Sequence, residues 1–396
     1  MLHVTLKSGR EKPLLQGHPW VFSGAIEREP KHAPGGSVVN VLAEDGRFLG
    51  RGYYNSQSQI RVRLLTRSAS ERVDTQFWRK RIDAACQRRD GILAQPGQTA
   101  ARLVMSETDL LPGLIVDRYG DYLVLQSLTA GIDARLGDII EALRIVCRPR
   151  GIIERSDDAV RELEGLESRS GLVYGELPPN GQVAIQENGV TYLVDLLAGH
   201  KTGYYLDQRQ NHQIIRDLAK DKDVLDCFSF TGGFTMAAAA GGARSVTSVD
   251  QSADALARLK DNLISNEYQS LHHASLHGDA FQILRTLVQE GRQYDLIVMD
   301  PPKFAANAGH IQRAARGYKD LNLQAFKLLR PGGYLATYSC SGHISPDLFQ
   351  KIIFSAAMDA GREAHILRWM HQSDDHPVLL SFPESHYLKG LLCRCL

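Results

Sequence analysis

Paired cysteines are missing from this sequence. Its 396 residues include six cysteines, and no two of them form a CxxC pair. This spacing argues against a disulfide framework and against a zinc site, so we expect free thiols and no metal. Cys393 and Cys395 could still share a metal. Two residues apart on a final strand, however, they face the same side, which favours packing in the core.

Long apolar runs are also missing. The chain contains no run of 18 apolar residues, and its start, "MLHVTLKSGREK", lacks the apolar core of a signal peptide. We therefore expect a cytoplasmic protein with no membrane partner. With 43% hydrophobic and 23% charged residues the composition is that of a globular protein, and the length suggests two or three domains.

The net charge of +1 conceals a basic N-terminal part. Residues 1–90 hold 16 Lys and Arg against 9 Asp and Glu, whereas the remaining residues hold 30 against 36. A surplus of cations on a small module is the electrostatic signature of a nucleic-acid partner. A basic face that is merely solvated is the alternative.

Residues 1–75 have the pattern of a small β-rich domain. The β-like runs "PWVFSGAI", "GGSVVNVLAEDGRFLGRGYYN" and "SQIRVRLLT" are separated by Gly and Pro, which predicts a barrel or a curled sheet. In "IRVRLL" apolar residues alternate with Arg61 and Arg63, so we expect one core face and one basic face. Nearby aromatic residues suit base stacking on RNA, with core packing as the alternative: Trp20, Phe22, Tyr53 and Tyr54.

The same segment resembles a known module. "LLQGHPWVFSGAI", followed by "GRFLGRGYYNSQSQIRVRLL", is similar to the PUA domain found on many RNA-modifying enzymes. The resemblance covers about 70 residues and implies RNA binding rather than chemistry.

Residues 76–190 have the pattern of a central α/β domain. A basic helix is expected over "DTQFWRKRIDAACQRRDGIL" at its start, and a second helix over "IDARLGDIIEALRIVC". Strands are expected over "ARLVMSE", over "LPGLIVDRYGDYLVLQS" with a hairpin turn at "DRYGD", and over "GIIERS". The segment contains no catalytic constellation, so we expect a structural, RNA-facing role.

Residues 191–396 alternate strands and helices regularly. Strands are expected over "DVLDCFS", "RSVTSVD", "YDLIVMD", "GYLATYSC", "AHILRW" and "HYLKGLLCRCL". Helices are expected over "GGFTMAAAAGG", "SADALARLKDNLIS", "FQILRTLVQE", "GYKDLNLQAFKLL" and "PDLFQKIIFSAAM". Single helices between strands predict a doubly wound, mostly parallel sheet, so the fold class is α/β with a Rossmann-like C-terminal domain.

The first two strands of this domain end in a nucleoside-binding pattern. In "VLDCFSFTGGFT", Gly232 and Gly233 permit close backbone approach at a helix N-terminus, and Asp250 ends the next strand, where it can bond ribose hydroxyls. The G-x-G-x-x-G that seats a pyrophosphate is missing, which argues against a dinucleotide. S-adenosylmethionine, which has ribose and adenine but no phosphate, fits better.

Four further residues complete the expected cofactor site. Asp226 suits the cationic amino-acid end of the cofactor. Asp279, in "LHGDAF" after a short third strand, suits the adenine amino group. Ala280 would pack or offer backbone, and Phe228 would flank the ligand. Each aspartate could instead cap a helix or be solvated.

A polar and aromatic segment, "GHKTGYYLDQRQNH", precedes the first strand. Lys201 and Asp207 are expected to close over the cofactor or to lie near RNA phosphate. A helix cap by Asp207 is the alternative.

The fourth strand ends in a rigid loop, "VMDPPKF". Pro301 and Pro302 can neither extend a ladder nor enter a helix interior, so they are expected to project Asp300 into the crevice. Methyltransferases that act on exocyclic amines use a similar [DN]PP-aromatic motif. Here Lys303 follows the prolines and Phe304 comes one residue later, which weakens that interpretation and leaves it open.

The fifth strand ends in "YSCSG", which brings Cys340 to the same edge as Asp300 if the sheet has the usual order. A thiolate that adds to carbon 6 of a pyrimidine activates carbon 5 for methylation. Asp300 is then placed to bond or protonate N3. We therefore expect Cys340 to be the nucleophile, with an ordinary buried thiol as the alternative.

Together "GHKTGYYLDQRQN", "VLDCFSFTGGFT", "SVTSVDQS", "VMDPPKF" and "YSCSG" resemble the ribosomal RNA large-subunit methyltransferase I family, essentially end to end. The resemblance implies S-adenosylmethionine-dependent formation of 5-methylcytosine in 23S ribosomal RNA. It also implies that Cys340 is the nucleophile and that Asp300 is the acid that contacts the base. The implied cofactor residues are Asp226, Gly232, Asp250 and Asp279. Many RNA 5-methylcytosine enzymes carry a second cysteine beside Pro in the fourth-strand loop, where this chain has Pro-Pro-Lys, so the group that releases the product stays open.

Two other functions stay open at this point. One is an exocyclic-amine methyltransferase acting on adenine or guanine in RNA, for which Cys340 would be irrelevant. The other is a noncatalytic RNA-binding factor in ribosome assembly. A homodimer is likewise left open by the sequence.

Overall fold

A computed structural model describes residues 2–199, 201–305 and 307–396. Contacts divide the chain into two compact units. The first contains residues 1–186, 194–206 and 375–385, and the second contains residues 187–193, 207–374 and 386–396. The three domains expected from the sequence, at 1–75, 76–190 and 191–396, stay a prediction beside this division. No helix in the described ranges is long and apolar enough to cross a membrane.

The first unit opens with a six-stranded sheet in the order β2-β6-β5-β4-β1-β3. Its elements are β1 (Leu2–Leu6), α1 (Lys12–Leu15), β2 (Trp20–Phe22), β3 (Ile26–Arg28), β4 (Ser37–Leu42), β5 (Phe48–Tyr54) and β6 (Ile60–Thr66). Alternate residues of these strands, such as Val4, Val41 and Val62, pack in one core cluster. The β-rich N-terminal segment expected from the sequence is therefore present. Strand β1 was not predicted, because its five residues carry no turn signal on their N-terminal side.

The basic face expected on β6 is wrong at Arg63. Its guanidinium is buried and forms ion pairs with Glu107 at 2.8 Å and with Glu164 at 3.2 Å. Tyr53 and Tyr54 are buried as well, so neither offers a ring for base stacking. Alternation along a strand separates its two faces, but it does not reveal which residues cover the second face.

A five-stranded sheet in the order β11-β10-β9-β8-β7 also belongs to the first unit. Its elements are α2 (Thr75–Gln87), α3 (Asp90–Leu93), β7 (Ala100–Met105), β8 (Leu114–Tyr119), β9 (Tyr122–Ser127), α4 (Ala130–Asp133), α5 (Leu136–Cys147), β10 (Gly151–Ser156) and β11 (Arg169–Gly175). Helices α2 and α5 pack together and bring the sulfurs of Cys86 and Cys147 to 3.6 Å. The predicted strands and helices are present; β11 was missed because it is a largely exposed edge strand.

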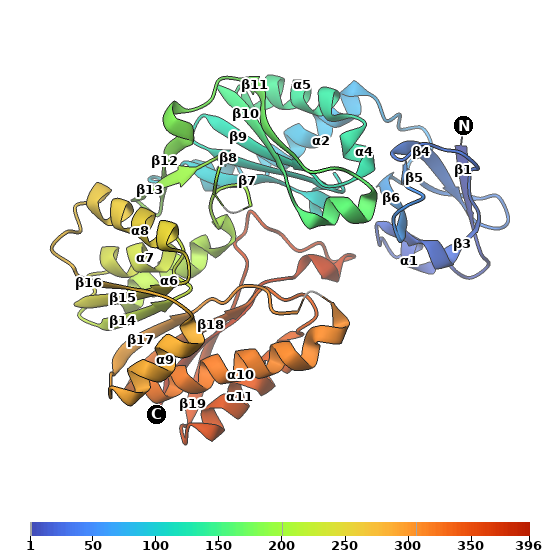
Figure 1. The fold of residues 1–396 in the computed structure, drawn as a ribbon. Helices are drawn as coiled ribbons and strands as arrows, with labels where there is room; N and C mark the ends of the chain where they lie inside the picture. Colours follow the sequence, from blue (N-terminus) through green and yellow to red (C-terminus); the bar gives the residue numbers. More distant parts are fainter. Residues whose placement is uncertain (1, 200, 306) are drawn as a thin grey trace. The chain divides into compact units, whose positions relative to one another are not determined.

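Two paired strands, β12 (Gln182–Glu187) and β13 (Val190–Asp195), form a sheet of their own. The second unit is built on a seven-stranded sheet in the order β16-β15-β14-β17-β18-β20-β19 (Figure 1). Its strands are β14 (Asp223–Cys227), β15 (Ser245–Asp250), β16 (His272–His277), β17 (Tyr294–Met299), β18 (Leu329–Ser339), β19 (Ala364–His371) and β20 (Lys389–Cys395). Pairing is parallel from β16 to β18, and β20 runs antiparallel to both of its neighbours.

Helices cover both faces of this sheet. They are α6 (Arg209–Leu218), α7 (Gly233–Ala240), α8 (Ala253–Ser265), α9 (Ala280–Gln289), α10 (Ile311–Leu328) and α11 (Pro346–Asp359). Helices α9, α10 and α11 share one core cluster with one face of the sheet, and α6 and α7 share another cluster with the opposite face (Figure 1). Because both faces are covered, a central strand such as β17 is apolar along almost its whole length. The Rossmann-like fold expected from the sequence is confirmed.

Three cysteines of this unit pack in its core, as the sequence predicted for Cys393 and Cys395. Cys227 on β14 is fully buried, and Cys393 and Cys395 on β20 lie in the cluster under α10 and α11.

Candidate active site

The strand order places a topological switch point between β14 and β17. Strand β15 follows β14 on one side, whereas the next strand on the other side, β17, comes later in the chain. Open α/β sheets bind ligands in the crevice beyond the carboxyl ends of the strands at such a point. Asp226 lies near the end of β14, Asp300 follows β17 and Cys340 follows β18, so all three belong to this edge.

Asp226 is fully buried at the end of β14. Its Oδ2 accepts a hydrogen bond from the Thr235 hydroxyl at 2.6 Å, and its Oδ1 has no partner among the described residues. Burial raises the pKa of this carboxyl to about 6, although the Thr235 bond works in the opposite direction. A buried acid with one unsatisfied oxygen is poised to receive a hydrogen-bond donor or a cation.

The turn after β14 is compact and rich in left-handed backbone. Phe228 has φ +63° and Phe230 has φ +49°, both unusual for residues with a side chain. Gly232 has φ +94°, and a Cβ there would lie 2.7 Å from Cγ of Leu259. Gly233 then opens α7. Only a glycine at 232 lets the chain turn this tightly into the helix, as the double-glycine pattern predicts.

The carboxylates of Asp250 and Asp279 accept hydrogen bonds from nearby backbone N–H groups, in addition to any role with a ligand. Both carboxylate oxygens of Asp250 accept backbone N–H groups, from Phe230 and from Ser252, each at 2.8 Å. Asp279 is the N-cap of α9, accepting from the Phe281 N–H at 2.7 Å, and Ala280 is the buried first residue of that helix. The helix-cap alternative is therefore realised at Asp279, which still leaves lone pairs for a ligand.

Of the segment before α6, Asp207 belongs to the second unit and Lys201 to the first. The Asp207 carboxylate accepts a hydrogen bond from the Tyr387 hydroxyl at 2.5 Å, and Gln208, not Asp207, is the N-cap residue of α6. Lys201 places its ammonium 4.9 Å from the centre of the Tyr205 ring. A cofactor role for either residue stays a prediction.

Asp300 is held by a residue that the sequence did not single out. Gln208 donates from Nε2 to Oδ2 of Asp300 at 2.9 Å, and Asn211 donates to Oε1 of Gln208 at 2.5 Å. Burial and the nearby charge of Asp207 raise the pKa of Asp300 to about 7, although the Gln208 bond and the charge of His212 oppose the rise. At neutral pH the group therefore populates both its acid and its carboxylate form, which suits a general acid–base.

Cys340 is half-buried immediately after β18, and its loop contacts the Asp300 loop directly. The Ser341 hydroxyl accepts from the backbone N–H of Ala305 at 3.2 Å and bonds the Tyr318 hydroxyl at 3.0 Å. The Phe304 ring packs 4.8 Å from the Tyr318 ring. The adjacency expected between the two loops is thus present, and the aromatic residue of "DPPKF" is engaged in protein packing.

Lys389, at the start of β20, is a second residue that sequence reasoning missed. It is paired in register with Ser339 at the end of β18 and is almost fully buried. Its ammonium donates to the carbonyl oxygens of Ser341 at 2.7 Å and Ile344 at 2.8 Å. A lysine directly before the apolar run "GLLC" in "HYLKGLLCRC" was the signal that could have identified it.

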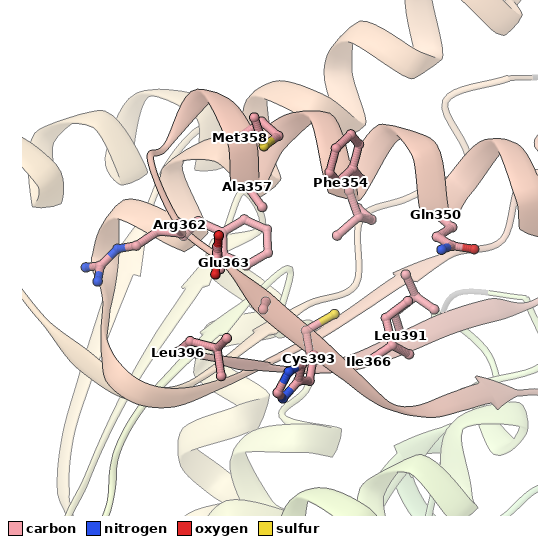
Figure 2. A pocket seen from close by; sticks show the side chains of 14 residues that line it. Gln350, Phe354, Ala357, Met358, Arg362, Glu363, Ile366, Leu391, Cys393 and Leu396 are labelled. Atoms are coloured by element: carbon pink, nitrogen blue, oxygen red, sulfur yellow. The ribbon is translucent and has the colours of Figure 1, made fainter.

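One cavity of the second unit lies elsewhere. It has a volume of about 400 Å³ and is lined by α11, β19 and β20, including Phe354, Met358 and Leu396 (Figure 2). Because β20 is antiparallel, its C-terminal end lies at the amino ends of the parallel strands. The cavity therefore does not belong to the edge that carries Asp300 and Cys340.

Comparisons with known proteins fit this geometry. A family model described as a PUA-like domain matches residues 4–67, and one described as an S-adenosylmethionine-dependent methyltransferase matches residues 168–394. A relative in Aeromonas salmonicida, Ribosomal RNA large subunit methyltransferase I, is 46% identical over 391 residues, covering 99% of this chain and 98% of its own length. The chain belongs to this family. A relative of the same name in Tolumonas auensis is 45% identical over 393 residues, 99% of both chains.

Solved structures agree with the family over the full length. A candidate S-adenosylmethionine-dependent methyltransferase from Streptococcus mutans covers 100% of both chains with a TM-score of 0.86 at 25% identity. A candidate methyltransferase complexed with SAH does so with a TM-score of 0.87 at 25% identity.

S-adenosylmethionine is the cofactor of this family member. The residues at the switch point fit it. The unsatisfied Oδ1 of Asp226 offers an acceptor to the cationic end of the cofactor.

Proposed function

We propose that this methyltransferase methylates carbon 5 of a specific cytosine in 23S ribosomal RNA through a covalent adduct of Cys340. The observation that carries the proposal is the pairing of a cysteine after β18 with a carboxyl group after β17, on loops joined through Ser341 and Ala305. The names of the relatives support a large-subunit RNA substrate, and the PUA-like match supports RNA binding.

Most of the residues that we propose for cofactor binding lie at this same edge of the sheet. Asp226 would receive the cationic amino-acid end, and Gly232 with Gly233 would allow close approach at the start of α7. Asp250 would bond the ribose hydroxyls. The adenine contacts would be made by Asp279 and Ala280, with Phe228 beside them and Asp207 on the segment before α6. The role expected of Lys201, which belongs to the first unit, stays a prediction from the sequence. When bound, S-adenosylmethionine supplies an electrophilic methyl group on a sulfonium.

Cys340 and Asp300 divide the chemistry on the base. The Cys340 thiolate forms a bond to carbon 6 as the protonated Asp300 gives its proton to N3, so that electron density moves to carbon 5. After carbon 5 has been methylated, solvent water or a side chain of the site takes its proton, and the bond between sulfur and carbon 6 breaks to return the Cys340 thiolate. Asp300 then takes the N3 proton back and the aromatic ring is restored.

Packing of Phe304 supports this proposal over amine methylation. An amine methyltransferase uses the aromatic residue after its DPP motif to stack the target base. Here the Phe304 ring lies against Tyr318 and Phe281, at 4.8 and 6.1 Å between ring centres. A ring committed to these neighbours is poorly placed to receive a base.

The experiment is methylation of protein-free and ribosome-bound 23S RNA by the wild-type chain and by Cys340→Ala, followed by nucleoside mass spectrometry. We expect 5-methylcytosine from the wild type and a loss of at least about a thousandfold in the variant, as is usual when a nucleophile is removed. A Cys227→Ala variant, which changes a buried thiol on β14, is the matched control and should stay active. Methylated adenine or guanine, or undiminished activity of Cys340→Ala, would contradict the proposal; binding of cofactor and RNA with no methylated product would favour an assembly factor.

A further inference from the structure

The turn that follows Cys340 is fastened from the neighbouring antiparallel strand. Lys389 starts β20 opposite Ser339, and its ammonium bonds the carbonyl oxygens of Ser341 and Ile344. These two carbonyls flank the short stretch Gly342–His343 that turns the chain from β18 toward α11. One side chain thus closes both ends of the turn.

Lys389 is an unusual group for this position. It is only 3% exposed, and lysine is rarely buried unless its charge has a function or a partner. An ammonium has three hydrogens, and two of them are used by the carbonyls of Ser341 and Ile344. Neither carbonyl carries a full negative charge, so the buried cation is compensated only in part by these bonds.

The groups that act electrostatically on Lys389 come from both catalytic loops. Burial lowers its pKa to about 8, the Cys340 sulfur favours its charged form, and the Lys303 ammonium of the "DPPKF" loop disfavours it. On the adjacent strand its register partner is His371, and three residues upstream His386 has its pKa lowered by burial, by Lys389 and by His371. The Cys340 sulfur is therefore the one favourable partner among these titratable groups.

We propose that Lys389 is a positioning residue for the Cys340 nucleophile, holding the turn that presents the thiol and keeping a cation beside its sulfur. This inference rests on the proposed role of Cys340. Because electrostatic interaction is reciprocal, a sulfur that stabilises the Lys389 ammonium is itself stabilised as the thiolate by that ammonium. Lys389 makes no bond to the base in this scheme and acts only through Cys340.

The test measures thiolate reactivity directly. The full chain is treated with iodoacetamide over a range of neutral to alkaline pH, and alkylation of the Cys340 peptide is followed by mass spectrometry. For Lys389→Met we expect the midpoint of the profile to move up by about one pH unit, which is about tenfold slower alkylation at neutral pH. The kcat for RNA methylation should fall by a similar factor while KM stays unchanged. Lys389→Arg, which keeps the cation, should recover much of both.

Controls separate this inference from the proposed function and from misfolding. Lys351→Met, on the exposed face of α11, removes a lysine whose bond is to Asp347 and should leave the Cys340 profile unmoved. Lys389→Gln keeps a donor for one carbonyl but lacks the charge, so it carries the same prediction if the Met variant does not fold. An unmoved alkylation profile in the folded variant overturns the inference. An active Cys340→Ala enzyme overturns the proposed function instead, whatever the profile shows.

Discussion

Gln208 donates a hydrogen bond from its side-chain amide to Oδ2 of Asp300 across 2.9 Å. The amide is itself oriented by Asn211, whose Nδ2 donates to the Gln208 oxygen. A donor to a carboxylate favours the charged form, so Gln208 works against the burial that raises the pKa of Asp300. Gln208, the N-cap residue of α6, thereby lowers the pH at which the proposed general acid loses its proton.

Replacing Gln208 by Leu should move the pH dependence of methylation. Asp300 must be protonated to act on N3, so activity is lost as pH rises through its pKa of about 7. Without the Gln208 donor that pKa rises further, and the descending limb of the profile of kcat/KM against pH moves to higher pH. Gln213→Leu, on helix α6, is the control because the Gln213 amide donates to the exposed Asp217. Coincident limbs for the wild type and Gln208→Leu would count against the role of Asp300.

Asp226→Asn should weaken cofactor binding and stabilise the folded protein. Burial raises the pKa of Asp226 from 3.8 to about 6, so the folded state binds the proton more tightly than the unfolded chain. The contribution of this proton to the stability of the folded state is complete below the unfolded pKa of 3.8 and is lost as pH rises through about 6. At mildly alkaline pH the neutral amide should therefore raise the free energy of unfolding by up to about 3 kcal/mol, while S-adenosylmethionine binds more weakly. Denaturant unfolding and titration calorimetry measure the two effects; unchanged cofactor affinity would remove Asp226 from the proposed site.

Ser341→Ala should loosen the junction between the two catalytic loops. Its buried hydroxyl bonds both the Ala305 N–H and the Tyr318 hydroxyl, and removal leaves these groups without that partner at a cost of about 1–3 kcal/mol. We expect a lower melting temperature together with a lower kcat. Ser345→Ala removes the N-cap of α11 instead, which costs about 1 kcal/mol and should leave kcat unchanged in the folded enzyme. An equal effect of both variants on kcat would show that the Ser341 junction has no special part in the reaction.

Sequence patterns predicted correctly those features that depend on a single helix or strand. Apolar runs located the parallel strands, and because parallel strands end at one edge, the position of Asp300 and Cys340 at the same edge could be predicted from the sequence. Gln208 and Lys389 could not be found in this way. They reach the same edge from α6 and from an antiparallel strand, and nothing in their local sequence says which loop they bond. The same limit explains Arg63, whose acidic partners come from distant parts of the chain.

Arg63→Met tests that correction. If Arg63 were part of an exposed RNA-binding face, the variant would lose RNA affinity and keep its stability. Because its guanidinium is buried between Glu107 and Glu164, we expect a loss of about 3–5 kcal/mol in stability from the two acids left without a partner. Arg28→Ala, at an exposed arginine of β3, should have no such effect. A full-stability Arg63→Met protein with weakened RNA binding would restore the original interpretation.

Trapping of the adduct tests the central claim most directly. RNA in which cytosine carries fluorine at carbon 5 cannot lose a carbon 5 proton after methylation, so an enzyme bonded to carbon 6 stays attached. With this RNA and S-adenosylmethionine, peptide mass spectrometry after denaturation should find the nucleotide on Cys340 in the wild type and no adduct in Cys340→Ala. Methylated, freely released RNA with no protein adduct at Cys340 would contradict the covalent mechanism.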